Sequence, residues 1–182
     1  MRLTLAGALA IATTATPATA FAVDYLSAEQ AAQLMFPDAD RFESREITLD
    51  AAQLQALAAE GVRGRSARWP VRVAQRAGAT LGYVVSDEVL GKFELISYAV
   101  AIDLEGAVKQ VEILSYRESH GGEVRLPAWR RQFVGKTAAA PLRVGEDIAN
   151  ISGATLSCTH VTEGVRRIVA VVALARRHGR LG

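Results

Sequence analysis

A long amphipathic run near the C-terminus most constrains the fold of this chain. It reads HVTEGVRRIVAVVALARRHG and covers residues 160–179. Its apolar residues recur at spacings of four, three and four: Val161, Val165, Ile168 and Val172. This spacing predicts one helix with a single buried stripe. The apolar part of the run is too short to cross a bilayer. The stripe must therefore be covered by another layer of the same domain.

The residues before this helix change from a helical to a strand period and are expected to supply that layer. The segments RWPVRVAQR and ATLGYVVSDEV flank the turn residues Ala77 and Gly78, which predicts a hairpin. FELISYAVAID and GAVKQVEILSYRE predict two further strands. In the second of these strands two sets of residues alternate between the faces, and one face is expected to point inward. One set is Val108, Gln110 and Glu112, and the other is Lys109, Val111 and Ile113. The fold class is α+β, a twisted, mainly antiparallel sheet with packed helices.

Shorter helices are expected on either side of the strands. Ser27 with Gln30, and Asp50 with Gln53, have the spacing of capping boxes at the start of two helices. LPAWRRQFVGK, residues 126–136, predicts a short helix or turn that begins near a proline.

Residues 1–22 have the pattern of a secretory signal peptide, with Arg2, a short apolar stretch and small residues up to Ala22. We expect the mature chain to start near Val23, and cleavage after Ala20 is the close alternative. A retained membrane anchor is a third possibility, disfavoured because the apolar stretch is short and interrupted. Residues 23–68 are expected to form an N-terminal helical segment and residues 69–182 the main domain.

Composition excludes several function classes. The chain has 21 basic and 19 acidic residues, which is not the charge of a nucleic-acid-binding protein. Cys158 is the single cysteine, so an internal disulfide is excluded, and the three histidines are scattered, so no metal site is expected. Basic residues gather within 63–68 and at Arg130 and Arg131. Each cluster is either a solvated face or a docking surface for an acidic partner.

The stretch NISGATLSCTH, residues 150–160, precedes the long helix and carries the candidate chemistry. The first N–H groups of a helix have no partner within it and favour an anion. Gly153 and Ala154 are small enough for a bulky group to approach, and Ser152 adds a hydroxyl donor. Thr155 presents a hydroxyl where a phosphate would lie. Two interpretations are open from these residues alone: an ordinary helix cap, or a site that holds or carries a phosphate.

The sequence around this stretch resembles the FMN-binding domain family. ISGATLSCTHVTEGV is similar to its flavinylation motif, and residues 82–122 are similar to its strands and to the motif E-T-P-G, which here reads Glu118-Ser119-His120-Gly121. AWRRQFVGK is similar to the W-x-x-Q-F-x-G that follows. The resemblance covers about residues 82–172, with its motifs in the family's order.

The resemblance implies a cofactor and a set of site residues. It implies FMN attached through a phosphoester to the motif threonine, which makes this chain a phosphoprotein, with Thr155, Ser152, Gly153, Ala154, Glu118 and His120 as the cofactor-binding residues. Lys92 is a candidate phosphate contact or a plain surface lysine. Trp129 is expected to be a packing anchor rather than a flavin stacker.

Two positions depart from the family pattern. Ala149 stands where the family usually has an aspartate, with Asp147 nearby as a candidate substitute. His120 stands where the family has proline, which removes backbone rigidity and adds a titratable ring.

The expected function is that of a periplasmic electron carrier, with the FMN performing the redox chemistry. The implied partners are an FAD:protein FMN transferase, which installs the flavin, and a membrane redox protein. Two other functions stay open: a non-covalent FMN-binding or phosphate-binding module, and a small periplasmic flavin reductase.

Overall fold

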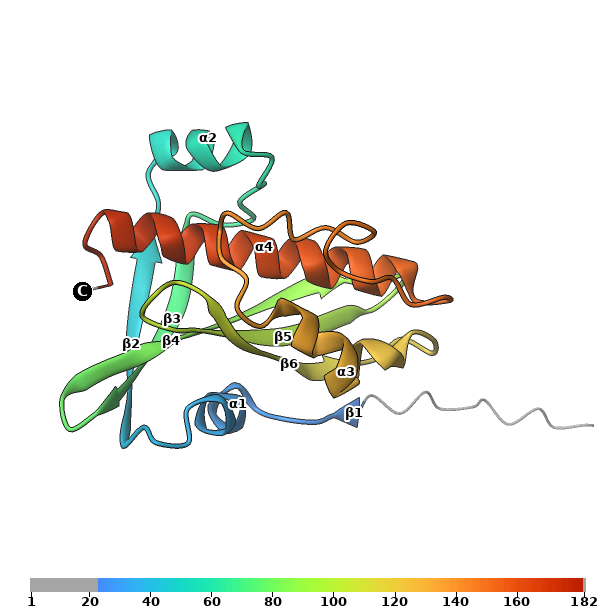
Figure 1. The fold of residues 1–182 in the computed structure, drawn as a ribbon, viewed down its shortest axis with the longest axis horizontal. Coiled ribbons are helices and arrows are strands. Elements are labelled where there is room, and N and C mark those ends of the chain that lie inside the picture. The colour runs from blue at the N-terminus through green and yellow to red at the C-terminus, as the bar shows by residue number, and fades with distance from the viewer. Residues whose placement is uncertain (1–22, 182) are drawn as a thin grey trace, which may run out of the picture.

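The computed structural model describes residues 23–181, and the expected signal peptide lies outside them. Twelve elements follow one another along the described chain (Figure 1): β1 Val23–Asp24, α1 Ala28–Met35, β2 Arg41–Thr48, α2 Ala51–Ala59, β3 Arg68–Arg76, β4 Ala79–Leu90, β5 Leu95–Ile102, β6 Val108–Tyr116, η1 Gly122–Arg125, α3 Pro127–Arg130, η2 Arg131–Phe133 and α4 Thr155–Arg177.

The strands form one six-stranded sheet in the order β1-β6-β5-β4-β3-β2, and every neighbouring pair is antiparallel. This confirms the α+β class. The expected hairpin joins β3 to β4. Its turn residues Ala77 and Gly78 have φ angles of 49° and 81°. Two successive positive φ values are what a two-residue hairpin turn of this twist requires.

Both expected capping boxes are present. The Ser27 hydroxyl accepts from the Gln30 N–H at 3.1 Å, and the Gln30 side chain accepts from the Ser27 N–H at 2.8 Å. Asp50 and Gln53 make the same reciprocal pair at 2.9 and 3.0 Å. Each box satisfies two N–H groups that the helix itself leaves unpaired. The starts of α1 and α2 are therefore fixed by local sequence.

The sheet is covered on both faces. In Figure 1, α4 lies along one face and α1 lies against the other, while α2 lies on the outer side of α4. Strand β5 shows how one strand serves both layers. Tyr98, Val100 and Ile102 belong to the core shared with α4, whereas Ala99 and Ala101 belong to the smaller core shared with α1. Burial on both sides explains why the strand reads as an almost unbroken apolar run.

The predicted stripe of α4 is confirmed: Val161, Val165, Ile168 and Val172 are all fully buried. The helix also lies very close to β5 at Gly164. A Cβ built there would lie 2.1 Å from the Tyr98 hydroxyl oxygen, so this position has no room for a side chain. The same hydroxyl donates to Asp87, which also pairs with Arg167 of α4 at 3.3 Å. No helix among residues 23–181 is long and apolar enough to cross a membrane.

Strand β6 departs from the simple alternation expected for it. Val108, Val111 and Ile113 all lie in the core shared with α4. The pairing with β5 explains this, because the register shifts between Ala101 and Ile102 and so inserts an extra residue into β6. This bulge shifts the alternation of side chains between the two faces of the strand by one residue. Val108 therefore lies on the same side as the later apolar residues.

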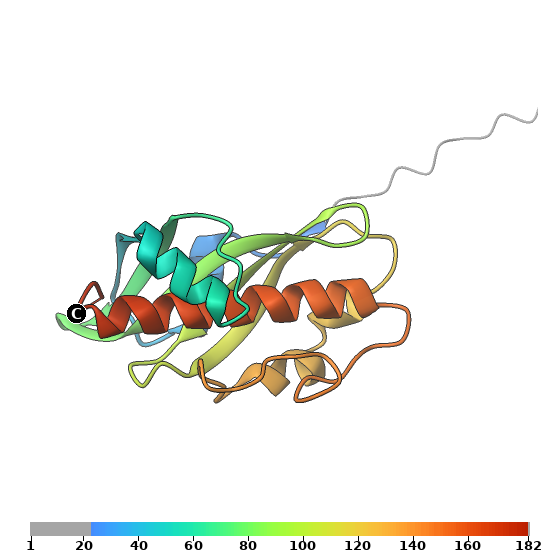
Figure 2. The same ribbon diagram turned by 90° about the horizontal axis from the view of Figure 1, so that it is seen from above.

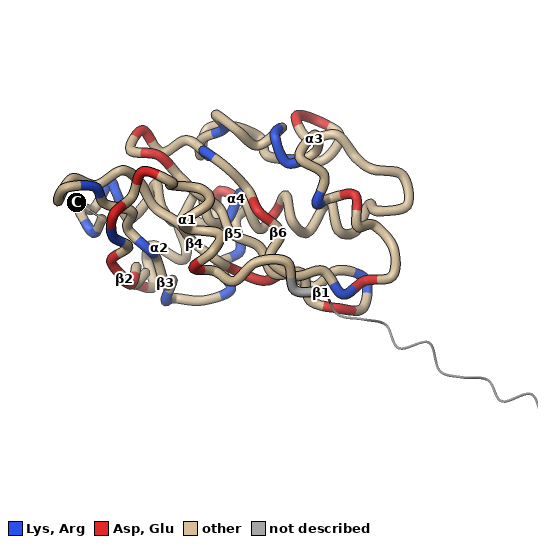
Figure 3. Tube along the Cα trace, turned by 90° about the horizontal axis from the view of Figure 1, so that it is seen from below, with Lys and Arg blue, Asp and Glu red and all other residues tan. Residues whose placement is uncertain are grey.

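Residues 23–68 contain the two expected helices and also two strands that the sequence had not indicated. β1 pairs with the end of β6, and β2 pairs along its whole length with β3. Strand β2 reads RFESREIT, with charged residues on both sides of the strand. Such a polar edge strand lacks an apolar period but resists pairing with another chain. Figure 3 shows acidic and basic residues interspersed over this side of the molecule rather than separated by sign.

The close approach at Gly164 predicts a stability change. Gly164→Ala gains about 1 kcal/mol of helix propensity, but overpacking against Tyr98 costs about 1–3 kcal/mol. Given the 2.1 Å separation we expect the upper end of that cost, so the variant loses about 1–2 kcal/mol in urea unfolding. The adjacent exposed variant Glu163→Ala is the control, with a change within about 0.5 kcal/mol. A Gly164→Ala protein as stable as the wild type would contradict the packing described.

Candidate functional site

The N-terminus of α4 has no side-chain cap. The helix begins at Thr155, its N-cap residue is Ala154, and no side chain bonds to the first-turn N–H groups. The first hydrogen bond of the helix runs from the Cys158 N–H to the Ala154 carbonyl at 2.9 Å. Thr155 is therefore the first helical residue and not the cap that one interpretation of the sequence proposed. The bare N–H groups of the first turn carry the positive end of the helix dipole.

A glycine turn leads into this helix and leaves its end open. Gly153 has a φ of +82°, a conformation that side-chain-bearing residues rarely adopt, and no atom lies within 4 Å of the position of a Cβ. Ser152 and Gly153 are both exposed. The turn therefore holds Thr155 at the surface without covering it.

The small size of Ala154 is explained by the loop that carries Gly121. A Cβ on Gly121 would lie 3.0 Å from the Ala154 Cβ and 2.7 Å from the Tyr116 hydroxyl oxygen. Gly121 also has a φ of +85°. The last residue of the E-S-H-G stretch and the alanine of the S-G-A-T stretch are thus fitted against each other, although they are distant in sequence.

Tyr116 at the end of β6 joins the same two segments. Its hydroxyl donates to the His120 carbonyl and lies 3.0 Å from the Ser157 hydroxyl. Burial raises the pKa of the Tyr116 phenol, which keeps the O–H in place as a donor. The His120 side chain is exposed at the rim beside this anchored backbone.

Glu118 holds the turn between β4 and β5. One of its oxygens accepts from the Phe93 N–H at 2.5 Å and the Glu94 N–H at 3.0 Å. The approach needs Gly91, since a Cβ there would lie 2.5 Å from the carboxylate oxygen. Partial burial acts to raise the pKa of Glu118, but the backbone N–H groups outweigh it, so that pKa lies below its ordinary value.

These segments enclose a cleft of about 470 Å³. Its lining residues come from the β4–β5 turn, the loop after β6 and the start of α4: Lys92, Phe93, Glu118, Ser119, His120, Gly153, Ala154, Thr155, Leu156 and Ser157. Five of the six residues predicted to bind the cofactor are brought together here. Ser152, the sixth, is exposed in the adjoining turn and is not part of the lining.

The segment before the turn is fixed by the W-x-x-Q stretch of residues 129–132. The Trp129 indole N–H donates to the Ala149 carbonyl at 2.8 Å, and the Gln132 side chain accepts from the Ala149 N–H at 2.7 Å. Trp129 is buried and packs edge-on against Phe133, so it is a packing anchor, as expected. Asn150 follows directly, and its side-chain amide donates to the Thr155 hydroxyl oxygen at 3.1 Å.

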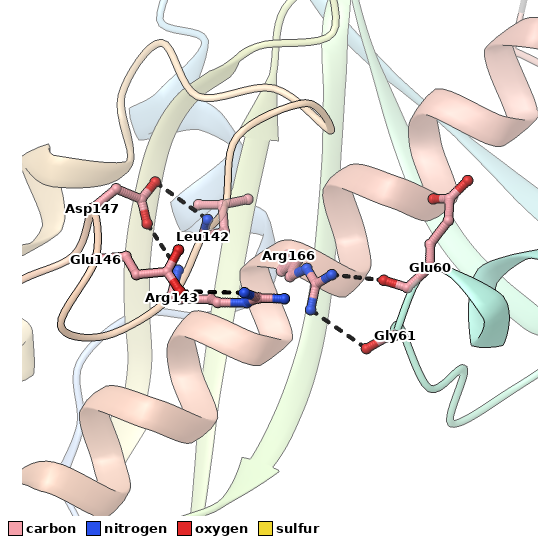
Figure 4. A network of polar contacts seen from close by, with 7 residues as sticks. All are labelled: Glu60, Gly61, Leu142, Arg143, Glu146, Asp147 and Arg166. Carbon is pink, nitrogen blue, oxygen red and sulfur yellow. Dashed lines mark hydrogen bonds and ion pairs between the residues drawn. The ribbon is translucent and has the colours of Figure 1, made fainter.

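Asp147 does not take the place of the aspartate that the family has at position 149. Its carboxylate accepts from the N–H groups of Leu142 at 3.2 Å and Arg143 at 2.8 Å (Figure 4), and it pairs with Lys136 at 2.8 Å. Burial acts to raise the pKa of Asp147, but these partners lower it below its ordinary value. Asp147 therefore closes its own loop, and Asn150 is the polar side chain that reaches Thr155.

The remaining reactive groups are the cysteine and the side chains that can bind a metal. Cys158 is fully buried, and burial raises the pKa of its thiol. Within residues 23–181, no three His, Cys, Asp or Glu side chains gather in the way that a metal site requires.

The fold and the matched motifs define an FMN-binding domain. Residues 91–170 match the family model described as the FMN-binding domain. This stretch includes β5, β6, the loop of Glu118, and the start of α4. Residues 91–170 of this chain therefore contain a domain of the FMN-binding family.

One curated protein and one solved structure are similar to this chain beyond the family model. The chain is 34% identical over 107 residues to a subunit of the proton-translocating ferredoxin:NAD(+) oxidoreductase complex of Clostridium ljungdahlii. That match covers 54% of this chain and 57% of the relative, so the chain is matched over little more than half of the relative's length. The crystal structure of a subunit of the Na(+)-translocating NADH-quinone reductase from Parabacteroides distasonis superposes with a TM-score of 0.52 and 17% identity. It covers 81% of this chain and 83% of that one, and it shows a shared fold.

The contacts of Glu118 predict that the stability of the folded protein depends on pH. The pKa of Glu118 is lower in the folded protein than in the unfolded chain, where it is about 4.3. Ionised Glu118 therefore stabilises the folded protein at pH values above the unfolded pKa. This contribution is lost as the pH falls through the folded pKa. Glu118→Gln should therefore be less stable than the wild type near pH 7, and the difference should shrink below about pH 4. Urea unfolding across this range measures it. A difference independent of pH would contradict the assignment.

Proposed function

We propose that this chain is an exported electron-transfer flavoprotein that carries FMN as a phosphoester on Thr155. The observation that carries the proposal is the position of the Thr155 hydroxyl. It lies on the first residue of α4, at a helix end without a side-chain cap, and on the lining of a 470 Å³ cleft. The match of residues 91–170 to the FMN-binding domain model supports FMN as the cofactor.

The residues present fit a phosphate with an aromatic ring attached. The bare N–H groups of the first turn of α4 and its dipole favour a phosphate beside Thr155. Gly153 leaves the approach to that position open. Phe93 and Leu156 add exposed apolar surface to the lining, at 73% and 47% exposure, which suits contact with a ring face. A cleft of this volume lies in the range of small-ligand sites.

Attachment of FMN to Thr155 is a transfer of the FMN part of FAD to the threonine oxygen. The Thr155 oxygen forms a bond to the phosphorus of the FMN half of FAD, the pyrophosphate bond of FAD breaks, and AMP leaves. The hydroxyl proton passes to a base of the FAD:protein FMN transferase that we propose as the partner. The product is a phosphodiester, which holds the cofactor without any further contact.

This chain's own residues prepare Thr155 for that step. Asn150 donates to the threonine oxygen, so the hydroxyl proton is not consumed by this contact and stays available for removal. Trp129 and Gln132 fix the backbone next to Asn150, and Tyr116 joins the loop of His120 on the opposite rim to Ser157 of α4. The bound FMN supplies the redox chemistry.

The names of the two relatives indicate the kind of electron-transfer chain. One belongs to a ferredoxin:NAD(+) oxidoreductase complex and the other to a NADH-quinone reductase. We propose a membrane redox protein as partner and the periplasm as location, the latter from the leader pattern of residues 1–22. Non-covalent binding of FMN in the same cleft, and flavin reduction, are the two alternative functions.

The first experiment is the intact mass of the protein co-expressed with the transferase. We expect a gain of one FMN less one water, retention of flavin fluorescence after denaturing electrophoresis, and loss of both in Thr155→Ala. Thr137→Ala is the matched control, because its hydroxyl lies outside the cleft lining and only accepts from the Ala139 N–H.

The transferase is tested in parallel on another substrate so that its activity is known. An unmodified wild-type mass under these conditions would overturn the covalent attachment. Flavin that co-purifies with the native protein but is released on denaturation would favour the non-covalent alternative. Steady turnover of a purified acceptor by the loaded protein would favour the reductase.

A second prediction concerns Asn150. A lost hydrogen bond is worth about 0.5–1.5 kcal/mol, so Asn150→Ala should slow flavin incorporation about two- to tenfold. Asn150→Asp should also slow it, because a carboxylate accepts the threonine proton instead of donating to the oxygen. Gln55→Ala on the exposed side of α2 is the control and should leave the rate unchanged. Incorporation at the wild-type rate in both Asn150 variants would exclude this positioning role.

A further inference from the structure

A second surface adjoins the cleft along the outer side of α4. Two hollows of about 250 and 340 Å³ lie between this helix, the segment after α2 and the end of β4. Both are lined by Glu163 and Arg167, so they are neighbours. The lining residues they do not share are mostly basic or apolar: Gly61, Val62, Arg63 and Arg166 in one, and Arg65, Val89, Leu90 and His160 in the other.

This surface continues into the cofactor cleft. The His160 ring N–H donates to the Leu90 carbonyl, which ties α4 to the end of β4 where the turn lining the cleft begins. Leu156, His160 and Glu163 follow one another at helical spacings of four and three, so they share one side of α4. Arg166 lies eleven residues after Thr155, or about 16 Å along the helix axis. A single bound protein could therefore contact both this surface and the cleft.

Arg65 and Arg166 of this surface donate to backbone carbonyls rather than to carboxylates. Arg166 donates to the Glu60 carbonyl at 2.7 Å and the Gly61 carbonyl at 3.4 Å (Figure 4), and Arg65 donates to the Glu88 carbonyl. These contacts fix the guanidinium groups but leave their charge uncompensated. Among the described residues no ion pair joins Arg63, Arg65 or Arg166 to a carboxylate. We call these three residues the arginine strip.

Two further charged residues, Arg167 and Glu163, line the hollows beside the strip. Arg167 is buried and pairs with Asp87 at 3.3 Å. Glu163 is the one carboxylate in the lining of the two hollows. Lys92 at the cleft adds a further positive charge next to the exposed ring of Phe93. The exposed Glu94 follows Phe93 in the same turn. The cleft lining also contains the carboxylate of Glu118, which accepts from the Phe93 and Glu94 N–H groups, so the positive charge of this rim is concentrated in the arginine strip.

Exposed apolar residues line the cleft and the adjoining hollow. Phe93 is 73% exposed, Leu90 is 54% exposed and Leu156 is 47% exposed. Apolar contact at the centre with charge around it is the anatomy of many transient protein interfaces. Figure 2 shows α2 crossing the C-terminal half of α4, which leaves the half next to the cleft uncovered by that helix.

We propose that the arginine strip, with Phe93, Leu90 and Leu156, docks an acidic electron-transfer protein over the cofactor cleft. The proposal rests on the proposed function, which places the redox group in that cleft. Carboxylates around the partner's redox centre would meet the strip, and its apolar centre would meet Phe93. Complementary charge of this kind speeds encounter and fixes orientation more than it raises affinity.

The test maps the binding of rubredoxin, an acidic one-electron carrier, to ¹⁵N-labelled protein purified after export. At low ionic strength we expect amide shifts within residues 61–66, 89–93 and 156–166, which weaken as salt is raised. Arg63→Glu/Arg65→Glu should raise the dissociation constant about tenfold. The matched control Arg76→Glu/Arg177→Glu makes the same charge change at the far end of the molecule and should have little effect.

Three outcomes would overturn the proposal. These are rubredoxin shifts over the α1 side of the sheet, equal effects of the two double variants, and tighter binding of a basic cytochrome c to the strip than of rubredoxin. Strip-dependent binding to phosphatidylglycerol vesicles without any binding of rubredoxin would assign the surface to a membrane and also overturn it. The mapping needs no bound flavin, so failure of the proposed function, read separately from the intact mass, is distinguishable from failure of the docking surface.

Discussion

The burial of α4 against the sheet is the interaction on which the rest of the structure depends. The helix runs from Thr155 to Arg177, and fourteen of its 23 residues are buried. Its close approach at Gly164 and the pairing of Arg167 with Asp87 fix it against β4 and β5. A helix held so firmly along its length presents its first turn at a defined place. The cleft is built around that turn, so the packing of the core determines where the Thr155 hydroxyl lies.

Features decided by local sequence were predictable, and features decided by distant contacts were not. The capping boxes at Ser27 and Asp50, the hairpin at Ala77 and the stripe of α4 each follow from residues within a few positions of one another. Strand β2 escaped prediction because its charged edge has no apolar period. The bulge in β6 is visible only once its register with β5 is known.

The same distinction applies to the site. The S-G-A-T and E-S-H-G stretches indicate most of the cleft lining, yet they do not show that Gly121 is fitted against Ala154. Asn150 and Tyr116 were missed as site residues because their roles arise from contacts with Thr155 and Ser157. The place of Asp147 was also hidden, since its bonds to Leu142 and Arg143 depend on the shape of its loop. Side-chain contacts between motifs, rather than the motifs themselves, complete the cleft.

Thr155, at a helix end without a side-chain cap, is the residue that we propose to carry FMN as an ester. Phosphorus NMR of the flavin-loaded protein tests this most directly, because a phosphate with one ester bond titrates with a pKa of about 6 whereas a diester does not. With the ester in place we expect one protein-bound resonance whose chemical shift stays constant between about pH 5 and about pH 8. A resonance that titrates across this range would show free FMN phosphate in the cleft and would contradict the claim.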